Sequence, residues 1–298
     1  MSLFISGLIP CEDLKCCRGN PQRCTGLILS SYWVLPRAHL YRLVARAYYG
    51  GMFLRNEIWG KFIKSTKYPN LGETDEKKGI TQPPLEIAYD STKPVVDLPS
   101  PSEIKVASMD LRRVIEDRVS VRHYLRKPLS LNELSWLLWC TQGVKQVTER
   151  PSTLRIVPSA GARHPFETYL LVNRVDGLKP GLYQFLSTKH KLLTQDLDET
   201  LIDKFSSANW SSEMLSECAV IFIWAAISYR TTYKYGNRGF RFLHLDAGHV
   251  CQNLYLATEA IECGTCAVGG FYDDYVNELL NLDGEENFVI YMATVGKK

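Results

Sequence analysis

The stretch from residue 233 to residue 271 constrains the fold more than any other part of the chain. Its apolar side chains recur at spacings of 4, 3, 4, 3 and 4 residues, at Leu243, Ala247, Val250, Leu254, Ala257 and Ile261. This spacing is the period of an α-helix. A second apolar row on the same stretch predicts a central, mostly buried helix. Gly248 lies in mid-helix at a cost in helix propensity, which suggests that another backbone comes close there.

Polar residues interrupt this helix on one side. Asp246, His249 and Asn253 form a stripe within otherwise apolar surroundings. A buried carboxylate and a buried imidazole need partners, and Arg238 and Arg241 are the expected ones. We therefore interpret Asp246 and His249 as mainly structural, with a catalytic His249 as the alternative.

Glycines mark the end of the same stretch. Gly264 is expected to end the helix as a left-handed cap. A short strand should then lead to Gly269 and Gly270, where the main chain can approach a flat ligand because no Cβ is in the way.

Composition excludes several classes of protein. The 298 residues are enough for one or two domains with a sizeable core, and a net charge of +3 without a basic stripe argues against nucleic acid. The longest apolar run, 219–227, is far shorter than the roughly 20 residues of a membrane span. Nine cysteines without a signal peptide predict reduced thiols and a cytoplasmic location. The CxxC of Cys263 and Cys266 has no second cysteine pair nearby, so it predicts small buried side chains and no metal site.

The order of the patterns predicts three segments. Residues 1–54 are an N-terminal extension of unknown role, and residues 55–104, punctuated by prolines, are an extended arm or linker. Residues 105–298 are the folded domain. In it, Ser130 followed by Glu133 predicts a capping box at the start of a helix, and helix signals recur at about 198–216. Strands are expected at 154–157 and in the buried run 219–227, with a hairpin formed by 181–187 and 191–195. Strands and helices mix there without regular alternation, and no GxGxxG opens a helix after a strand, so we predict an α+β fold with a central antiparallel sheet flanked by helices.

Two short motifs have the residue types of a ligand site. Arg118, Ser120 and Arg122 place two guanidinium groups and a hydroxyl beside the end of a predicted helix, a pattern suited to phosphate oxygens, although a solvated basic loop is the alternative. The loop 158–161 contains only small side chains. It is either a simple turn or a surface on which backbone lies against an aromatic ring.

Six ordered motifs resemble one family. They are RVSVR at 118–122, PSAGARHPFE at 158–167, GLYQF at 181–185, KYGNRGFRF at 234–242, LDAGH at 245–249 and VGGF at 268–271. Together they resemble SagB-type dehydrogenases, a branch of the flavin-dependent nitroreductase superfamily, from about residue 59 to residue 296.

The resemblance implies a nitroreductase-like homodimer with one FMN at each of two subunit interfaces. It implies that Arg118, Ser120 and Arg122 hold the FMN phosphate and ribityl chain, with Lys297 or Lys298 near the C-terminus as further phosphate contacts. The resemblance implies three further groups of flavin contacts. The isoalloxazine would lie against Pro158, Ser159, Ala160 and Gly161 of the partner chain. Gly269 and Gly270 would offer a backbone N–H near flavin N5, and Gln142 would touch the flavin edge.

The resemblance also implies a catalytic pair, Lys234 and Tyr235, as in related azoline dehydrogenases that act on modified peptides. The physical reason is that hydride can leave a carbon only if a proton leaves its neighbour, and a lysine desolvated against an aromatic wall can serve as the base. We therefore expect an FMN-dependent oxidoreductase that oxidises a heterocycle such as an azoline, in a small molecule or a peptide. The alternatives are a nitro or quinone reductase with NAD(P)H as electron donor, and a flavin-free, non-catalytic scaffold subunit.

Overall fold

A computed structural model describes residues 57–106, 109–149, 151–209 and 212–298. Residues from Trp59 to Lys298 form one compact unit. The predicted extension, 1–54, lies outside the described residues, as do the four cysteines near the N-terminus.

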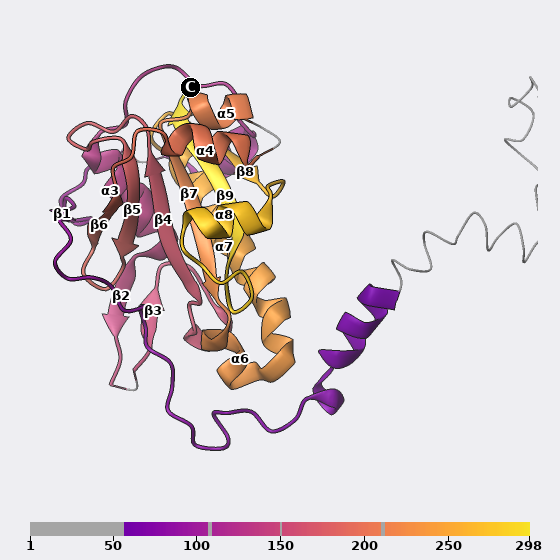
Figure 1. The fold of residues 1–298 in the computed structure, drawn as a ribbon. Helices are drawn as coiled ribbons and strands as arrows, with labels where there is room; N and C mark the ends of the chain where they lie inside the picture. The colour runs from indigo at the N-terminus through magenta and orange to yellow at the C-terminus, as the bar shows by residue number, and fades with distance from the viewer. Residues whose placement is uncertain (1–56, 107–108, 150, 210–211) are drawn as a thin grey trace, which may run out of the picture. The chain divides into compact units, whose positions relative to one another are not determined.

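Seven strands of the described residues form one antiparallel sheet (Figure 1). Its spatial order is β1 (Val95–Asp97), β6 (Lys191–Asp196), β5 (Gly181–Leu186), β4 (Phe166–Val172), β7 (Val220–Ile227), β9 (Asn287–Lys297) and β8 (Cys263–Val268). Each neighbouring pair runs antiparallel. The predicted sheet, the hairpin of β5 and β6 and the buried strand at 219–227 are thus confirmed.

Helices cover both faces of this sheet. On one face, α3 (Leu131–Gln142) and α7 (Gly239–Glu259) pack against alternate residues of the central strands, including Leu170, Phe222 and Trp224. On the other face, α4 (Leu201–Ser207), α5 (Ser212–Glu217) and α8 (Asp273–Leu279) cover Tyr169, Ile221 and Ile223. The two-residue period of a strand sends successive side chains of β4 and β7 into two separate cores.

Helix α3 begins where its sequence predicts. Ser130 accepts a hydrogen bond from the backbone N–H of Glu133, and Glu133 accepts one from the backbone N–H of Ser130. This reciprocal capping box satisfies two donors that the first helical turn leaves without partners. Helix α2 (Leu111–Asp117) precedes it and is capped by Asp110.

Helix α7 differs from the expectation in two ways. It ends at Glu259 rather than at Gly264, which lies inside β8, where an added Cβ would come within 2.5 Å of Val121. Gly264 is therefore needed for a close approach and not for a cap. The helix also keeps one exposed stripe in the single chain, with Leu245 58% exposed and no atom within 4 Å of a Cβ added at Gly248. Within the described part of the chain, no backbone outside α7 itself comes close to Gly248.

Short elements were harder to predict. The helix signals at about 198–216 belong to two short helices, α4 and α5. The strand expected at 154–157 is β3 (Thr153–Arg155), and it pairs with an unpredicted strand, β2 (Val144–Val147), in a separate hairpin. The described residues also contain three 3₁₀ turns: η1 (Tyr68–Asn70), η2 (Ala160–Ala162) and η3 (Gly236–Arg238), the last following α6 (Tyr229–Tyr235).

Residues 66–93, called the strap below, are held along the domain by polar contacts. The backbone N–H of Glu76 donates to the carbonyl of Tyr233 at 3.1 Å. Arg230 Nε donates to the carbonyl of Pro84 at 2.9 Å, and Lys93 Nζ donates to Gln195 Oε1 at 2.8 Å. The strap therefore runs past α6 and across the end of the sheet towards β1 (Figure 1).

Candidate active site

Most of the predicted site residues form two groups at different points of α7, with Gln142 and Lys298 outside them. Ser120 lies beside Tyr255, whereas Ser159 and Ala160 lie beside Asp246. Nine residues separate Asp246 from Tyr255, and at 1.5 Å per helical residue they are about 14 Å apart along the axis. Within one chain, helix α7 therefore holds the two groups apart.

The first group runs along β8. Ser120 Oγ lies 3.0 Å from Tyr255 Oη, and the Arg118 guanidinium carbon lies 5.2 Å from the centre of the Tyr255 ring. The backbone N–H of Val121 donates to the carbonyl of Thr265 at 3.0 Å, which fixes the bend 118–122 against β8. Because β8 leads directly into Gly269 and Gly270, the structure brings these two predicted motifs to one edge of the sheet.

Arg118 and Arg122 differ from the arginines of the preceding helix in their ion pairing. Arg112 pairs with Glu116 at 2.8 Å and Arg113 with Asp117 at 3.2 Å on the preceding helix. Among the described residues, no carboxylate lies within ion-pair distance of Arg118 or Arg122. Two guanidinium groups without acidic partners beside a hydroxyl are able to bind an anion.

The backbone at Gly269 is open. Gly269 is exposed, and the nearest atom to a Cβ added there would be Cε2 of Tyr291, at 3.8 Å. A flat group therefore has room to approach the main chain at this point.

The second group is held by Asp246. Its Oδ2 accepts hydrogen bonds from Ser159 Oγ at 2.6 Å and from the backbone N–H of Ala160 at 3.2 Å. Burial raises the pKa of the Asp246 carboxyl, and these two hydrogen bonds oppose the rise. His249 Nδ1 is 4.0 Å from Asp246 Oδ1, and its side chain is half exposed.

The expected pairing of Asp246 and His249 with Arg238 and Arg241 is wrong. Arg241 Nε donates to Thr66 Oγ1 at 2.6 Å, and Arg238 Nη1 donates to the Thr66 carbonyl at 3.2 Å. Both arginines point to the strap because Asp246 lies further along α7 and is already bound by the loop 158–161.

Lys234 and Tyr235, at the end of α6, pack against the loop 158–161. Gly161 has a φ of +59°, and a Cβ added there would collide with the Tyr235 hydroxyl and lie 3.2 Å from Cδ of Lys234. Only glycine fits both the left-handed backbone and this close approach. Burial is the main cause that raises the pKa of the Tyr235 phenol. The structure therefore joins two motifs that lie more than seventy residues apart in sequence.

The strap supplies a neighbour that the sequence did not indicate. Glu76 Oε1 lies 3.3 Å from Lys234 Nζ, and both side chains are mostly buried. The backbone hydrogen bond from Glu76 to Tyr233 fixes the carboxylate at this position. No local pattern distinguishes Glu76 from the other acidic residues of the strap, since its role depends on a contact across more than 150 residues.

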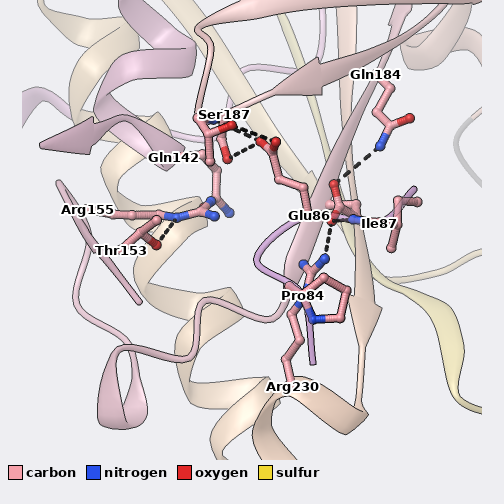
Figure 2. A network of polar contacts seen from close by, with 11 residues as sticks. Pro84, Glu86, Ile87, Gln142, Thr153, Arg155, Gln184, Ser187 and Arg230 are labelled. Atoms are coloured by element: carbon pink, nitrogen blue, oxygen red, sulfur yellow. Dashed lines mark hydrogen bonds and ion pairs between the residues drawn. The ribbon is translucent and has the colours of Figure 1, made fainter. Parts of the chain in front are cut away.

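Gln142 lies in a buried polar network rather than at an open edge (Figure 2). Its Oε1 accepts from Arg155 Nη1 at 2.9 Å, and its Nε2 has no partner among the described residues. Nearby, Glu86 of the strap accepts hydrogen bonds from Ser187 Oγ and from the backbone N–H of Thr188. The contact of Gln142 with a ligand stays a prediction.

The C-terminal lysines have acidic partners. Lys298 Nζ lies 2.5 Å from Glu259 Oε2, and Lys297 pairs with Glu133. A phosphate would have to compete with these carboxylates, and the predicted role of Lys298 is not tested by this geometry.

The CxxC cysteines are buried in β8, as predicted. Burial raises the pKa of the Cys263 thiol to about 11 and also raises that of Cys266. Such thiols are poor nucleophiles and poor metal ligands. Among the described residues, no group of three or more His, Cys, Asp or Glu side chains is arranged to hold a metal ion.

Comparison with known proteins identifies the family. The profile of the Nitroreductase family matches residues 115–297. The chain belongs to the nitroreductase family. The matched range begins within α2 and includes every predicted site residue except Lys298.

Curated relatives support this membership of the nitroreductase family. MJ1384 of Methanocaldococcus jannaschii, provisionally named a nitroreductase, is 36% identical over 203 residues, which are 68% of this chain and 96% of the relative. The microcin B17-processing protein McbC of Escherichia coli is 27% identical over 136 residues, 44% of this chain and 50% of McbC. The resemblance to SagB-type dehydrogenases is thereby confirmed at the level of distant homology.

Solved structures share the nitroreductase fold. A protein of Anabaena variabilis, provisionally named a nitroreductase, has a TM-score of 0.57 and 24% identity over 70% of this chain and 42% of its own. The Escherichia coli microcin synthetase McbBCD complex with truncated pro-MccB17 has a TM-score of 0.52 and 21% identity over 65% of this chain and 74% of the matched chain. The chain thus spans about half of McbC and less than half of the Anabaena protein.

Within the described part, we find no helix that is long and apolar enough to span a bilayer.

Proposed function

We propose that this nitroreductase-family protein is an FMN-dependent dehydrogenase of the SagB type that oxidises a heterocycle, such as an azoline, in a modified peptide. The observation that carries the proposal is the contact of Lys234 and Tyr235 with Gly161. In this proposal a candidate base and a candidate phenolic donor lie against the loop that the family resemblance assigns to the flavin ring. The similarity to McbC, a microcin-processing protein, favours a peptide substrate.

The residues present fit FMN. Arg118 and Arg122, which have no acidic partners among the described residues, would hold the phosphate together with Ser120. The open backbone at Gly269, with Gly270 after it, would face the edge of the ring system, and the loop 158–161 would cover its face. The chemistry that bound FMN would supply is two-electron acceptance of hydride at N5, with oxygen as the oxidant that restores the flavin.

Helix α7 gives a physical reason for a homodimer. Asp246 and Tyr255 lie nine positions apart, which is two and a half helical turns, so the two groups of one chain lie on opposite sides of α7 as well as about 14 Å apart along it. A two-fold axis that packs α7 against its copy in the opposite direction would bring the Asp246 end of one chain to the Tyr255 end of the other. The exposed stripe with Leu245 and Gly248 is where such packing would occur.

In this site the protein residues bind, orient and move a proton. Lys234 would take the proton from the substrate carbon next to the one that loses hydride. Glu76, at 3.3 Å, would stabilise the resulting ammonium group. Tyr235 would orient the heterocycle, since its raised pKa keeps the phenol protonated and able to donate a hydrogen bond.

Substitution Lys234→Ala tests the proposal. We expect the purified variant to stay yellow with unchanged FMN content, because the lysine lies on the loop side and not beside the phosphate-binding residues. Turnover of an azoline-containing peptide should fall by about 10²- to 10⁴-fold, the usual contribution of a general base. The measurement is flavin absorbance together with mass-spectrometric detection of the two-hydrogen loss. Lys204→Ala, on the distant helix α4, is the matched control. Unaltered turnover in Lys234→Ala would remove Lys234 from the catalytic site.

A second candidate function is reduction of nitro compounds or quinones with NAD(P)H. The higher identity and coverage of MJ1384 compared with McbC favours it. Anaerobic NADPH would then bleach the flavin band rapidly, whereas a dehydrogenase of the first kind would be bleached by its azoline substrate. Colourless protein that FMN cannot reconstitute would contradict both and support a non-catalytic scaffold.

A further inference from the structure

The Tyr255 hydroxyl lies between the bend 118–122 and strand β8, which leads to Gly269 and Gly270. Its Oη lies 3.0 Å from Ser120 Oγ and 2.8 Å from the backbone nitrogen of Ala267. Ala267 lies two residues before Gly269. Neither periodicity nor motif spacing distinguishes Tyr255 from the other ring-bearing residues of α7.

We propose that Tyr255 is a positioning residue that orients the Ser120 hydroxyl as a hydrogen-bond donor to the FMN phosphate. The inference rests on the proposed function, because it assigns the anion to the flavin nucleotide. Tyr255 itself acts through Ser120 and the bend 118–122.

The direction of the hydrogen bonds follows from the atoms available. A backbone N–H can only donate, so the Tyr255 oxygen accepts from Ala267. The single phenol proton is then directed either to Ser120 Oγ or to the Cys266 thiol, which also contacts Tyr255. A hydroxyl oxygen is a stronger acceptor than a thiol sulfur. The proton therefore goes to Ser120, and the hydrogen of Ser120 is left to donate to another acceptor.

The surroundings of Ser120 indicate that this acceptor is an anion. Arg118 and Arg122 flank Ser120 and have no carboxylate partners among the described residues. The Arg118 guanidinium also lies over the Tyr255 ring, which restricts its movement. One tyrosine thus positions two of the three predicted phosphate contacts, the hydroxyl through its own hydroxyl and the guanidinium through its ring.

Substitution Tyr255→Phe isolates the hydroxyl, because the ring beneath Arg118 remains. After removal of bound flavin, the dissociation constants of FMN and riboflavin are measured by quenching of flavin fluorescence. We expect the FMN constant to rise about 10-fold, as for a lost hydrogen bond to a charged group, and the riboflavin constant to change less than about 2-fold. Tyr183→Phe, which removes the hydroxyl that donates to the Lys179 carbonyl, is the matched control and should change neither constant.

A double-mutant cycle separates positioning from general support of the fold. If Tyr255 acts through Ser120, then Tyr255→Phe should have little further effect on FMN affinity in a Ser120→Ala background. Equal effects in both backgrounds, or equal losses for FMN and riboflavin, would overturn the inference. If Tyr255→Phe does not fold, as judged by its thermal unfolding, Ser120→Ala alone decides, because the inference requires it to weaken FMN selectively.

These measurements distinguish a failure of this inference from a failure of the proposed function. A wild-type protein that binds no FMN contradicts the proposed function. A wild-type protein that binds FMN, with Tyr255→Phe binding it equally well, contradicts only the role of Tyr255.

Discussion

His164 shows how a single residue is affected by the packing around the loop 158–161. Its side chain is 5% exposed, and the positive charges of Arg155 and Arg163 disfavour a positive charge on the imidazole ring. Burial, and next to it the charge of Arg155, lowers the pKa of His164 to about 3. Burial also lowers the pKa of Arg155 to about 10. His164 is therefore neutral in the folded protein at any physiological pH, which argues against a role as a proton carrier.

The neutral state of His164 predicts a pH dependence of stability. Below the ordinary histidine value of 6.5 the unfolded chain takes up a proton, whereas the folded chain does so only near pH 3. The unfolded state then binds more protons, so the free energy of unfolding falls as pH drops through this window, by at most about 1.4 kcal/mol per pH unit. Urea unfolding at several pH values between 7 and 4.5 measures the slope. It should be shallower in His164→Gln and unchanged in His123→Gln, whose ring is exposed. Identical slopes in all three proteins would contradict a buried neutral imidazole.

The strap is the element whose role changes most between sequence and structure. Its proline-rich sequence predicts an arm, yet its polar groups connect it to α6, β4 and the turn after β5. Glu167 is central to this connection, because it pairs with Arg230 at 2.5 Å and accepts from the backbone N–H of Ile87 at 3.0 Å. Both charged side chains are almost fully buried. Since the same strap carries Glu76 to Lys234, its attachment and the candidate site are linked.

Removing one charge of this ion pair should destabilise the fold more than removing both charges. Arg230→Met leaves Glu167 ionised and buried without a cation, which should lower the free energy of unfolding by about 3–5 kcal/mol. The double variant Arg230→Met/Glu167→Gln has no buried charge and should recover part of this loss. Urea unfolding measures both, and limited proteolysis of residues 77–92 reports release of the strap. A double variant as unstable as the sum of its single variants would show that the ion pair is not coupled.

At the scale of the whole molecule, α2 and α7 are two helices that expose large apolar side chains in the single chain. Leu245 on α7 and Leu111 and Ile115 on α2 are more than half exposed. Apolar side chains of this size are normally covered when they form a patch. A second copy of the chain is the occupant that our proposed function requires, because it would also supply the loop 158–161.

Substitution Leu245→Asp should therefore disrupt both association and flavin binding. A charge on each side of a two-fold axis introduces repulsion and buries an unpaired carboxylate. We expect sedimentation to show a monomer and FMN to be lost with it. Val95→Asp adds the same charge on the edge strand β1 and should remain dimeric and yellow. If Leu245→Asp is as dimeric as the wild type, α7 is not the interface. A monomeric Leu245→Asp variant that retains FMN would contradict the shared site.

The sequence by itself determined the features whose signal is local. The 3.6-residue apolar period of α7, the capping box of α3 and the apolar run of β7 depend on neighbours within a few residues, so they could be predicted and are confirmed. The six ordered motifs identified the family for the same reason. Each is a short run of residues, and their order along the chain can be recognised without knowing any tertiary contact. The roles of the predicted site residues remain predictions, although the structure brings most of them into two groups and leaves Gln142 and Lys298 outside these.

Only the tertiary structure decided which groups meet. The partners of Arg238 and Arg241, the close approach that requires Gly264, and the contacts of Glu76 and Tyr255 all join residues far apart in sequence. Such contacts depend on how the strap and the two faces of the sheet pack together. No local propensity encodes them, because any of several acids, rings or carbonyls could satisfy the same side chain. The choice among them is made by the packed fold, in which buried polar groups must find partners.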